Sequence, residues 1–566
     1  MILILLSWIY ILFTTINLGY YTNRILLLKN GNFIIISILG LFTSTLITSI
    51  WAIFGRINLE FHLFLIILNT VLIFNFYKQI ILLYQSFFYK LVSLSIHLKT
   101  ILSIISILIL AQCASIPYII DNESYYIQTI KWINEFGFVK GLGNLHFFLA
   151  QTSGWHILQS AYNFSFLYDK FNDISGFCLL LGNVFSIVKL NDYFNNKNLK
   201  YLIVGLIPIA NVLFFQFISS PSPDIPIYIF SFFIFYYFLK DYKKPTIENF
   251  NLIVILVLFS LYIKTTSLVL ITIPVFLLVK NFNKYFPELI KTVLISLTIL
   301  TLFILKNSII SGYPFFPIVD INILYSDYKI PETIAKLYYQ ETKLCGFFIT
   351  NAQYDKMSVT ELFIKWITLP KLHGLFNKLS IILICVSPVF IYKYFNKREI
   401  WILYFIMCIQ MAILFLSSPQ FRFFMNFILL FSFFITATII KNKNFIILLL
   451  YLFTFITGFV LLNPINLNMF TKNKFVLISS NFSIENVIFP YKNTKFNTDF
   501  EYLQKGNLHY YSPIENDFFW SSGDGKLPCV NKVQIDYFKK HYFILPQQRT
   551  TDLKDGFYSK KLIINE

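Results

Sequence analysis

The chain of 566 residues is 57% hydrophobic and 19% aromatic, and only 13% of its residues are charged. Soluble domains carry about 25% charged residues, and the apolar runs of this chain are too long for ordinary core helices, so a soluble fold is excluded. The formal net charge of +18 does not indicate nucleic-acid binding. The basic residues lie mostly in short gaps between apolar runs, where they set topology and contact the anionic headgroups of a lipid bilayer.

Apolar runs long enough to cross a bilayer recur along most of the chain. Each crossing needs about 17–25 residues, so the sequence predicts an all-α polytopic integral membrane protein with about fourteen transmembrane helices. The predicted crossings are 1–19, 33–55, 61–77, 100–118, 173–190, 201–219, 226–240, 251–264, 265–280, 290–306, 377–394, 400–417, 423–440 and 445–463. The runs at 226–240 and 251–280 are the weakest, and the second is also compatible with one long broken helix. The first run lacks a preceding basic region and a following cleavage site, which favours a spanning helix over a signal peptide.

Basic residues in alternate gaps set the predicted orientation, because cytoplasmic loops are enriched in Lys and Arg. The predicted cytoplasmic gaps hold Arg24 and Lys29; Lys78, Lys90 and Lys99; Lys197 and Lys200; Lys240, Lys243 and Lys244; Lys280, Lys284 and Lys291; Lys393, Lys397 and Arg398; and Lys441 and Lys443. With an even number of crossings, both the N-terminus and the C-terminus are expected on the exported side. The abundance of Lys, Ile, Asn and Phe is typical of an AT-rich genome, so we expect a bacterial inner (cytoplasmic) membrane.

The crossings and the longer polar segments divide the chain into six predicted units. These are N-terminal helices at 1–118, an exported loop with interfacial helices at 119–172, central helices at 173–306, a second large exported loop at 307–376, C-terminal helices at 377–463, and an exported module at 464–566. The last unit contains turn signals such as Ser522-Gly523-Asp524-Gly525 and short aromatic strand-like runs. It is therefore expected to be a small α/β or β module.

Acidic residues occur in two segments that the predicted topology places at the same membrane face. Asp121 and Glu123 directly follow the fourth crossing, and Asp224 lies two crossings later in Ser220–Pro226. Burial near an apolar surface raises the pKa of a carboxylate and suits it to act as a general base, whereas a bound divalent cation keeps it ionised. The alternatives are a solvated turn for Asp121 and Glu123 and a helix N-cap for Asp224.

Further candidate residues lie near the same predicted face. Lys264 interrupts an apolar run, where a charge is costly unless it is paired or hydrated. Arg422 precedes the thirteenth crossing, and its rigid guanidinium suits a phosphate. The alternatives are snorkelling for Lys264 and an interfacial anchor for Arg422. The candidate substrate-binding residues are Tyr126, His146, His156, Lys264, Tyr313 and Arg422. The six cysteines include no CxxC pair and no Cys/His cluster, which argues against a zinc site.

Taken together, these residues resemble the GT-C superfamily of membrane glycosyltransferases. The resemblance implies transfer of a sugar from a polyprenyl-phosphate carrier on the exported face, with an acidic motif in the first exported loop supplying the base. Asp121 and Glu123, the interfacial region at 126–168 and Asp224 occur in the order that this superfamily shows. Lys264, in Tyr262-Ile263-Lys264-Thr265-Thr266, resembles a lysine-containing turn that follows in many members.

The sequence is more closely similar to uncharacterised bacterial polytopic membrane proteins. The similar stretches are Asn144-Leu145-His146, Ser153-Gly154-Trp155-His156, the Gly-Tyr-Pro-x-x-Pro motif at 312–317 and Leu527-Pro528-Cys529, within about 110–530. The chain departs from these families in two ways. Its two acids are not adjacent, which leaves open which one is the base. It has no cysteine shortly before Trp520, so Cys529 is expected to be unpaired or joined to Cys345.

The resemblance implies a glycosyltransferase that works by direct displacement. Asp121 or Glu123 would deprotonate an acceptor hydroxyl, Asp224 would orient the acceptor or hold Mg²⁺ or Mn²⁺, and Lys264 and Arg422 would offset charge on the leaving lipid phosphate. One alternative is a polymerase or ligase of surface polysaccharide, although such sites use more Arg and His. Another is a transporter or flippase of lipid-linked sugars, which would need charges through the membrane midplane.

Overall fold

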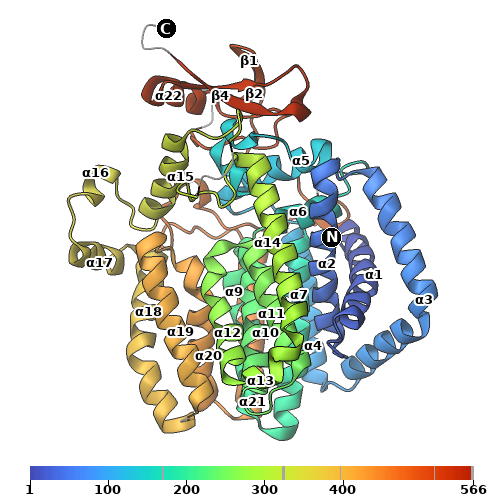
Figure 1. The fold of residues 1–566 in the computed structure, drawn as a ribbon. Helices are drawn as coiled ribbons and strands as arrows, with labels where there is room; N and C mark the ends of the chain where they lie inside the picture. The colour runs from blue at the N-terminus through green and yellow to red at the C-terminus, as the bar shows by residue number, and fades with distance from the viewer. Residues whose placement is uncertain (169–170, 322–324, 396, 515–516, 563–566) are drawn as a thin grey trace.

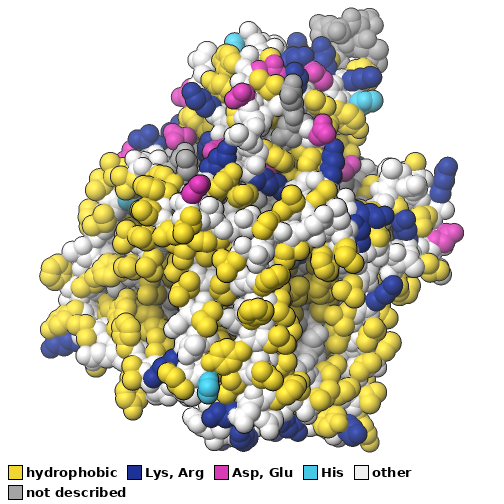
Figure 2. Space-filling view, turned by 180° about the vertical axis from the view of Figure 1, so that it is seen from behind, with side chains coloured by type: hydrophobic (Ala, Val, Ile, Leu, Met, Phe, Trp, Pro, Cys, Tyr) yellow, Lys and Arg dark blue, Asp and Glu magenta, His cyan; other side chains and the backbone are white. Residues whose placement is uncertain are grey.

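A computed structural model of the protein describes residues 1–168, 171–321, 325–395, 397–514 and 517–562. It shows a bundle of apolar helices with a small module of strands and one helix at one end (Figure 1). Among the described residues, eleven helices are long and apolar enough to cross a membrane. This confirms the prediction of a helical, multi-pass membrane protein. Space-filling Figure 2 shows a broad hydrophobic surface over the bundle, with charged side chains gathered towards its two ends.

The eleven spanning helices agree closely with the predicted apolar runs. They are α1 (Ile2–Ile25), α2 (Phe33–Phe54), α3 (Leu59–Val92), α4 (Ile96–Cys113), α7 (Ile174–Asn196), the broken helix Leu199–Phe217 that starts with α8 (Leu199–Gly205), α14 (Leu289–Ser311), Lys371–Phe395 containing α18 (Lys371–Phe390), α19 (Arg398–Ser417), α20 (Phe421–Ile439) and α21 (Lys443–Leu462).

The three remaining predicted runs are helical as well. They form α10 (Asp224–Asp241), α11 (Ile247–Ile263), and the 3₁₀ helix η6 (Thr265–Ile271) followed by α12 (Thr272–Lys280). Just beyond α12, the ring of Tyr285 stacks on that of Phe250, in the first turn of α11, at a centroid distance of 4.2 Å. The end of α12 therefore lies beside the start of α11, and the chain turns back on itself at Lys264. This geometry favours two antiparallel segments over one long broken helix.

Helix α3 is longer than its predicted run. The helix continues to Val92, but the backbone of Phe76 is not helical (φ −132°, ψ 17°). The predicted run ended at residue 77, beside this break. In Figure 1 the first half of α3 diverges from α1 and α2, and the second half runs back towards α4. The second half contacts the start of α2, where the ring of Phe87 stacks on that of Phe33 at a centroid distance of 4.1 Å. Its side chains are mostly exposed, and the charged Lys78 and Lys90 lie in it.

Helices α1 and α2 pack with their backbones almost in contact. A Cβ atom added at Gly19 would lie 1.8 Å from the carbonyl oxygen of Ile36, and one added at Gly40 would lie 1.8 Å from that of Thr15. Small residues at such crossings allow close van der Waals packing of helices in lipid, where no hydrophobic force drives association. The two glycines therefore set the distance between α1 and α2.

Between the bundle and the terminal module lie short helices of the first polar loop (119–172) and of the second polar loop (307–376) (Figure 1). They are the π-helix η1 (Asn122–Tyr126), α5 (Ile127–Phe136), the 3₁₀ helix η3 (Phe147–Gln151), α6 (Gly154–Tyr162) and α15 (Glu332–Cys345). Helices α16 (Asn351–Tyr354) and α17 (Val359–Ile367) of the second loop protrude at the side of the bundle. Helices η1, α5 and α6 are largely buried. They form a packed layer instead of lying free on a membrane surface.

The terminal module contains two antiparallel hairpins and one helix. Strand β1 (Phe500–Lys505) pairs with β2 (Leu508–Pro513), and β3 (Ile544–Gln548) pairs with β4 (Phe557–Lys561). Helix α22 (Lys532–Tyr542) lies between the two hairpins in the sequence. The N-terminal amine donates a 2.7 Å hydrogen bond to the carbonyl of Asn486, so the chain's start lies beside the segment that leads into this module.

Candidate functional site

A cavity of about 300 Å³ lies where the helix bundle meets the polar loops. Its lining comes from η1, α6, the turn between α11 and η6, α14, α15, α20 and the tail, which is the segment 464–566 that contains the terminal module. Five of the candidate residues proposed from the sequence line it: Asp121, Tyr126, His156, Lys264 and Arg422. Aromatic side chains, among them Phe148 and Trp520, complete the wall. The cavity therefore combines charged groups with large apolar surfaces, as small-molecule sites do.

Four charged side chains form a continuous chain of ion pairs at this cavity. Lys264 is bonded to one oxygen of Asp224. The other oxygen of Asp224 lies 3.9 Å from the guanidinium of Arg422, which also donates a 2.8 Å hydrogen bond to Asp121. The side chain of Asp224 is only 3% exposed, whereas those of Asp121 and Arg422 are about one quarter exposed. Asp224 thus lies behind the wall, and Asp121 and Arg422 face the cavity.

Local backbone structure brings these residues together from distant parts of the sequence. Asp121 immediately precedes the π-helix η1, a type of helix that is frequent at functional sites. Lys264 has extended backbone (φ −153°, ψ 120°) between α11 and η6, so its side chain leaves the helical path. Arg422 is the second residue of α20, and its own carbonyl accepts a 2.8 Å hydrogen bond from Tyr228 of α10.

Asp224 does not act as a helix cap. It is the first residue of α10, Pro223 holds the cap position, and no side-chain cap hydrogen bond is present at this helix start. The alternative that Asp224 is an N-cap is therefore wrong. Its carboxylate is instead used in the ion pairs with Lys264 and Arg422.

Glu123 points away from the cavity and into the tail. Its carboxylate accepts hydrogen bonds from the Thr494 hydroxyl and, at 2.9 Å, from the backbone N–H of Lys495. Burial raises the pKa of Glu123, while these hydrogen bonds oppose the rise. Asp121 and Glu123 are two residues apart, yet only Asp121 faces the cavity.

His146 and Tyr313 lie behind the cavity wall. Nδ1 of His146 accepts a hydrogen bond from the backbone N–H of Phe148, and the Tyr313 hydroxyl donates to the carbonyl of Ile330. Their proposed role in substrate binding stays a prediction.

His156 lines the cavity, and neither of its buried ring nitrogens has a hydrogen-bond partner among the described residues. Burial lowers the pKa of His156 to about 3, so the ring is neutral.

Several residues of the cavity wall carry little signal in the sequence. Lys306 of α14 is 3% exposed, donates a hydrogen bond to the carbonyl of Thr152, and has no carboxylate partner within the described part of the chain. In the sequence, Lys306 is the last residue of the predicted crossing 290–306. Glu341 of α15, and Phe518 and Trp520 of the tail, also line the cavity. Nothing in the sequence places these three residues at the cavity, because only tertiary packing brings their segments to it.

One role predicted for Asp224 from the sequence is the binding of a divalent cation. Among the described residues, no group of three or more His, Cys, Asp or Glu side chains is arranged to hold a metal ion. The proposal of Mg²⁺ or Mn²⁺ at Asp224 therefore stays a prediction.

Cys345 and Cys529 are both free thiols, and the Cys529 thiol donates a hydrogen bond to the carbonyl of Ser522. These two cysteines are therefore not joined by a disulfide.

The fold and the cavity define a polytopic helical membrane protein with a polar site at the boundary of its apolar bundle. The chain belongs to the family described as Domain of unknown function (DUF8201), whose model matches residues 1–429. No curated protein and no solved structure matches the chain. The family match includes Asp121, Asp224, Lys264 and Arg422, and the whole tail lies beyond it.

Proposed function

We propose that the protein is a GT-C type membrane glycosyltransferase of the bacterial inner membrane. It transfers a sugar from a polyprenyl-phosphate donor to an acceptor of the cell envelope. The observation that carries this proposal is the placement of Asp121, Arg422 and Lys264 at one cavity where an apolar bundle meets polar loops. Such a boundary suits a substrate with a lipid tail and a polar headgroup.

Asp121 is the proposed general base, because it faces the cavity and Glu123 does not. Its carboxylate takes the proton from an acceptor hydroxyl. The acceptor oxygen bonds to the anomeric carbon of the donor sugar, and the bond from that carbon to the phosphate oxygen breaks. The electron pair leaves with the lipid phosphate, whose charge Arg422 and Lys264 offset. Asp224 holds these two cations in place through its ion pairs.

The proposed topology has fourteen crossings, with both termini and the terminal module on the exported side. Three observations support it. The N-terminal amine contacts Asn486 of the tail, and the turn at Lys264 lies at the same end as Asp121. Figure 2 shows acidic side chains mainly around the module, whereas the opposite end of the bundle displays mostly Lys and Arg. That asymmetry is the one expected for a cytoplasmic end.

Transfer of labelled sugar from a polyprenyl-phosphate donor to envelope acceptors tests the proposal. Asp121→Asn keeps the shape of the side chain and removes the base, so the rate should fall by about 10²- to 10⁴-fold with normal membrane insertion. The matched control is Asp517→Asn, since the Asp517 side chain is 82% exposed and lies outside the cavity lining. Activity of Asp121→Asn equal to that of the control would rule out the general-base assignment. The same assay with EDTA tests the Mg²⁺ or Mn²⁺ requirement.

A further inference from the structure

The tail supplies part of the cavity wall, although it lies beyond the region that defines the family. Phe518 and Trp520 line the cavity together with Phe148 of the first polar loop. More than 370 residues of chain separate Trp520 from Phe148, yet their ring centroids are 5.2 Å apart. The site is therefore built jointly by the membrane region and the tail.

A dense set of hydrogen bonds docks the segment after Trp520 onto the start of the first polar loop. The backbone N–H groups of Ser522 and Gly523 donate to the carbonyl of Glu123 at 2.9 Å and 2.8 Å. The Gln128 side chain donates to the carbonyls of Gly523 and Gly525. The tail thus contacts η1, the helix that Asp121 precedes. The same helix therefore positions the proposed base and this segment of the tail.

The Glu123 carboxylate fastens a second piece of the tail to the same helix. It accepts hydrogen bonds from Thr494 and from the backbone of Lys495, while Asn122 donates to Glu123 and to the carbonyl of Asn493. The Glu123 residue is fully buried. Removal of this buried acceptor would leave its hydrogen-bond donors unsatisfied, which lowers the stability of the docked tail. Glu123 is thereby placed as a positioning residue for the tail.

The indole of Trp520 packs among aromatic side chains at the cavity wall. Its ring packs edge-on against Phe147 and Phe148, with centroid distances of 4.7 Å and 5.2 Å, and its carbonyl lies 3.3 Å from Nε2 of His146. A preorganised aromatic surface beside polar groups suits a ring with one apolar face and several hydroxyls. A sugar pyranose ring has that character.

We propose that Trp520 contacts a saccharide ring in the cavity and that Glu123 acts by positioning the tail segment 518–525 that carries it. This role of Trp520 rests on the proposed function, but saccharide binding can be measured independently of sugar transfer. The same chemistry fits the sugar of the lipid donor and a saccharide acceptor. A rise in KM for only one of the two substrates distinguishes these sources.

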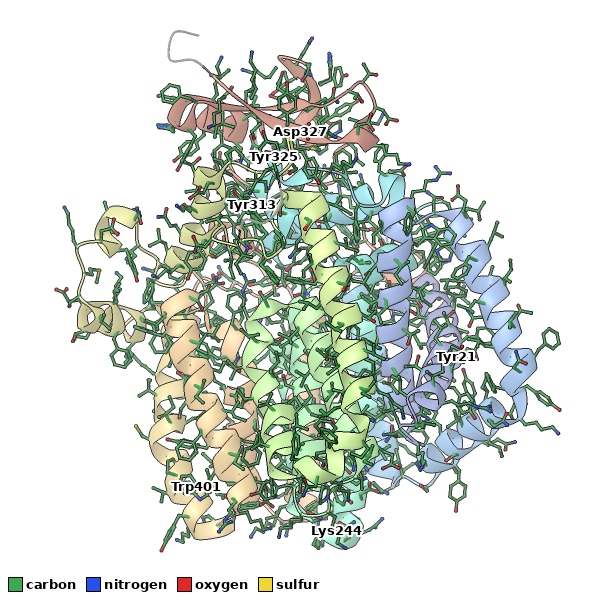
Figure 3. All side chains as sticks on the ribbon, viewed as in Figure 1. Tyr21, Lys244, Tyr313, Tyr325, Asp327 and Trp401 are labelled. Atoms are coloured by element: carbon green, nitrogen blue, oxygen red, sulfur yellow. The ribbon has the colours of Figure 1, made fainter. Side chains whose placement is uncertain are left out.

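The direct test uses the full-length protein in lipid nanodiscs and saturation-transfer NMR with the methyl glycosides of glucose, galactose, mannose and N-acetylglucosamine. The wild-type protein should bind at least one glycoside. Trp520→Ala should weaken that binding about tenfold, which corresponds to the loss of about 1.4 kcal/mol, and Trp520→Phe should retain most of it. The control is Trp401→Ala, because Trp401 lies at the opposite end of the bundle (Figure 3).

The outcomes separate this inference from the proposed function. Glycoside binding that Trp520→Ala weakens supports the inference, even if no transfer is detected. Unchanged binding in Trp520→Ala, or no binding of any glycoside by the wild-type protein, overturns it, even if transfer occurs.

Glu123 has its own readout. A positioning role predicts that Glu123→Ala raises KM about tenfold with little change in kcat, and increases hydrogen exchange at 518–525. Glu123→Gln should restore both, because its amide can still accept a hydrogen bond. If Glu123→Ala instead slows turnover by about two orders of magnitude or more and leaves exchange at 518–525 unchanged, Glu123 is the base and the positioning role is overturned.

Discussion

The charged residues at the cavity stabilise the protein through pairing as well as serving the proposed reaction. The Asp224 carboxylate is buried between Lys264 and Arg422. Removal of one partner from a buried ion pair leaves an uncompensated charge and costs about 3–5 kcal/mol. We therefore expect Asp224→Asn to lower the thermal unfolding midpoint of the detergent-solubilised protein strongly. A helix cap would account for only about 1 kcal/mol.

A second substitution checks that the loss comes from the unpaired lysine. Asp224→Asn combined with Lys264→Met removes both charges and should recover part of the lost stability. Glu332→Gln is the control, because the Glu332–Lys336 pair is exposed and such pairs contribute little. If Asp224→Asn behaves like Glu332→Gln, the ion-pair chain does not support the fold.

At the residue scale, the sequence was most informative where charge interrupts apolar runs. Asp121, Lys264 and Arg422 lie at the ends of predicted crossings on one predicted face, and the structure brings them to one cavity. The orientation of Glu123 was not predictable, because it depends on a π-helix and on tail residues far along the chain. Trp520 was not predictable for the same reason, since only tertiary packing brings it to the cavity.

At the element scale, the close approach of α1 and α2 gives the next prediction. Gly19→Ala and Gly40→Ala each add a methyl group where backbone atoms of the partner helix leave no room. Overpacking of this kind costs about 1–3 kcal/mol, although alanine is otherwise the better helix former. Both variants should unfold at lower temperature than the wild-type protein. Gly31→Ala is the matched control, because no atom lies within 4 Å of the added Cβ. Equal midpoints for all three variants would contradict the close packing of α1 against α2.

The elements show which features of a membrane sequence determine its helices. Every predicted crossing is helical, because the backbone must satisfy its own hydrogen bonds in lipid. Helix ends were less predictable. Helix α3 continues past its apolar run as a helix with mostly exposed side chains, and its break at Phe76 carries no Pro or Gly signal. The short helices η1, α5 and α6 were expected at an interface, but tail residues bond to η1 and α5, and α6 packs against α2 and α5.

At the scale of the whole molecule, the proposed topology can be tested with reporter fusions. Fusions after Pro245 and Asn442 should report a cytoplasmic location, because both follow basic residues at the end opposite the module. Fusions at Gln340 and Trp520 should report the exported side. Accessibility labelling at the same positions in intact and permeabilised cells provides the control. A cytoplasmic signal from Trp520 would invert the assigned orientation and place the cavity on the other face of the membrane.

Two buried histidines of the first polar loop, His146 and His156, should make the whole molecule acid-labile. Burial lowers the pKa of His146 to about 4 and that of His156 to about 3, both below the ordinary 6.5. Lys306 and Lys264 lower the pKa of His156 further, and Asp121 opposes them. Between pH 6.5 and about 4 the unfolded chain binds more protons than the folded protein. The free energy of unfolding therefore falls as pH decreases through this window and is independent of these groups above it.

The measurement is the thermal unfolding midpoint of the detergent-solubilised protein between pH 7.5 and 4.5. Between these pH values, the free energy of unfolding should fall by about 1–3 kcal/mol for each buried histidine. Burial raises the pKa of Glu123, so its contribution has the opposite sign and stabilises the folded protein as pH falls. His146→Gln and His156→Gln should each flatten the dependence, whereas His541→Gln should not, because its ring is exposed on α22. A midpoint that is equally acid-sensitive in all three variants would show that the two histidines are not buried as neutral rings. The packing of Trp520 against His146 would then be incorrect as well.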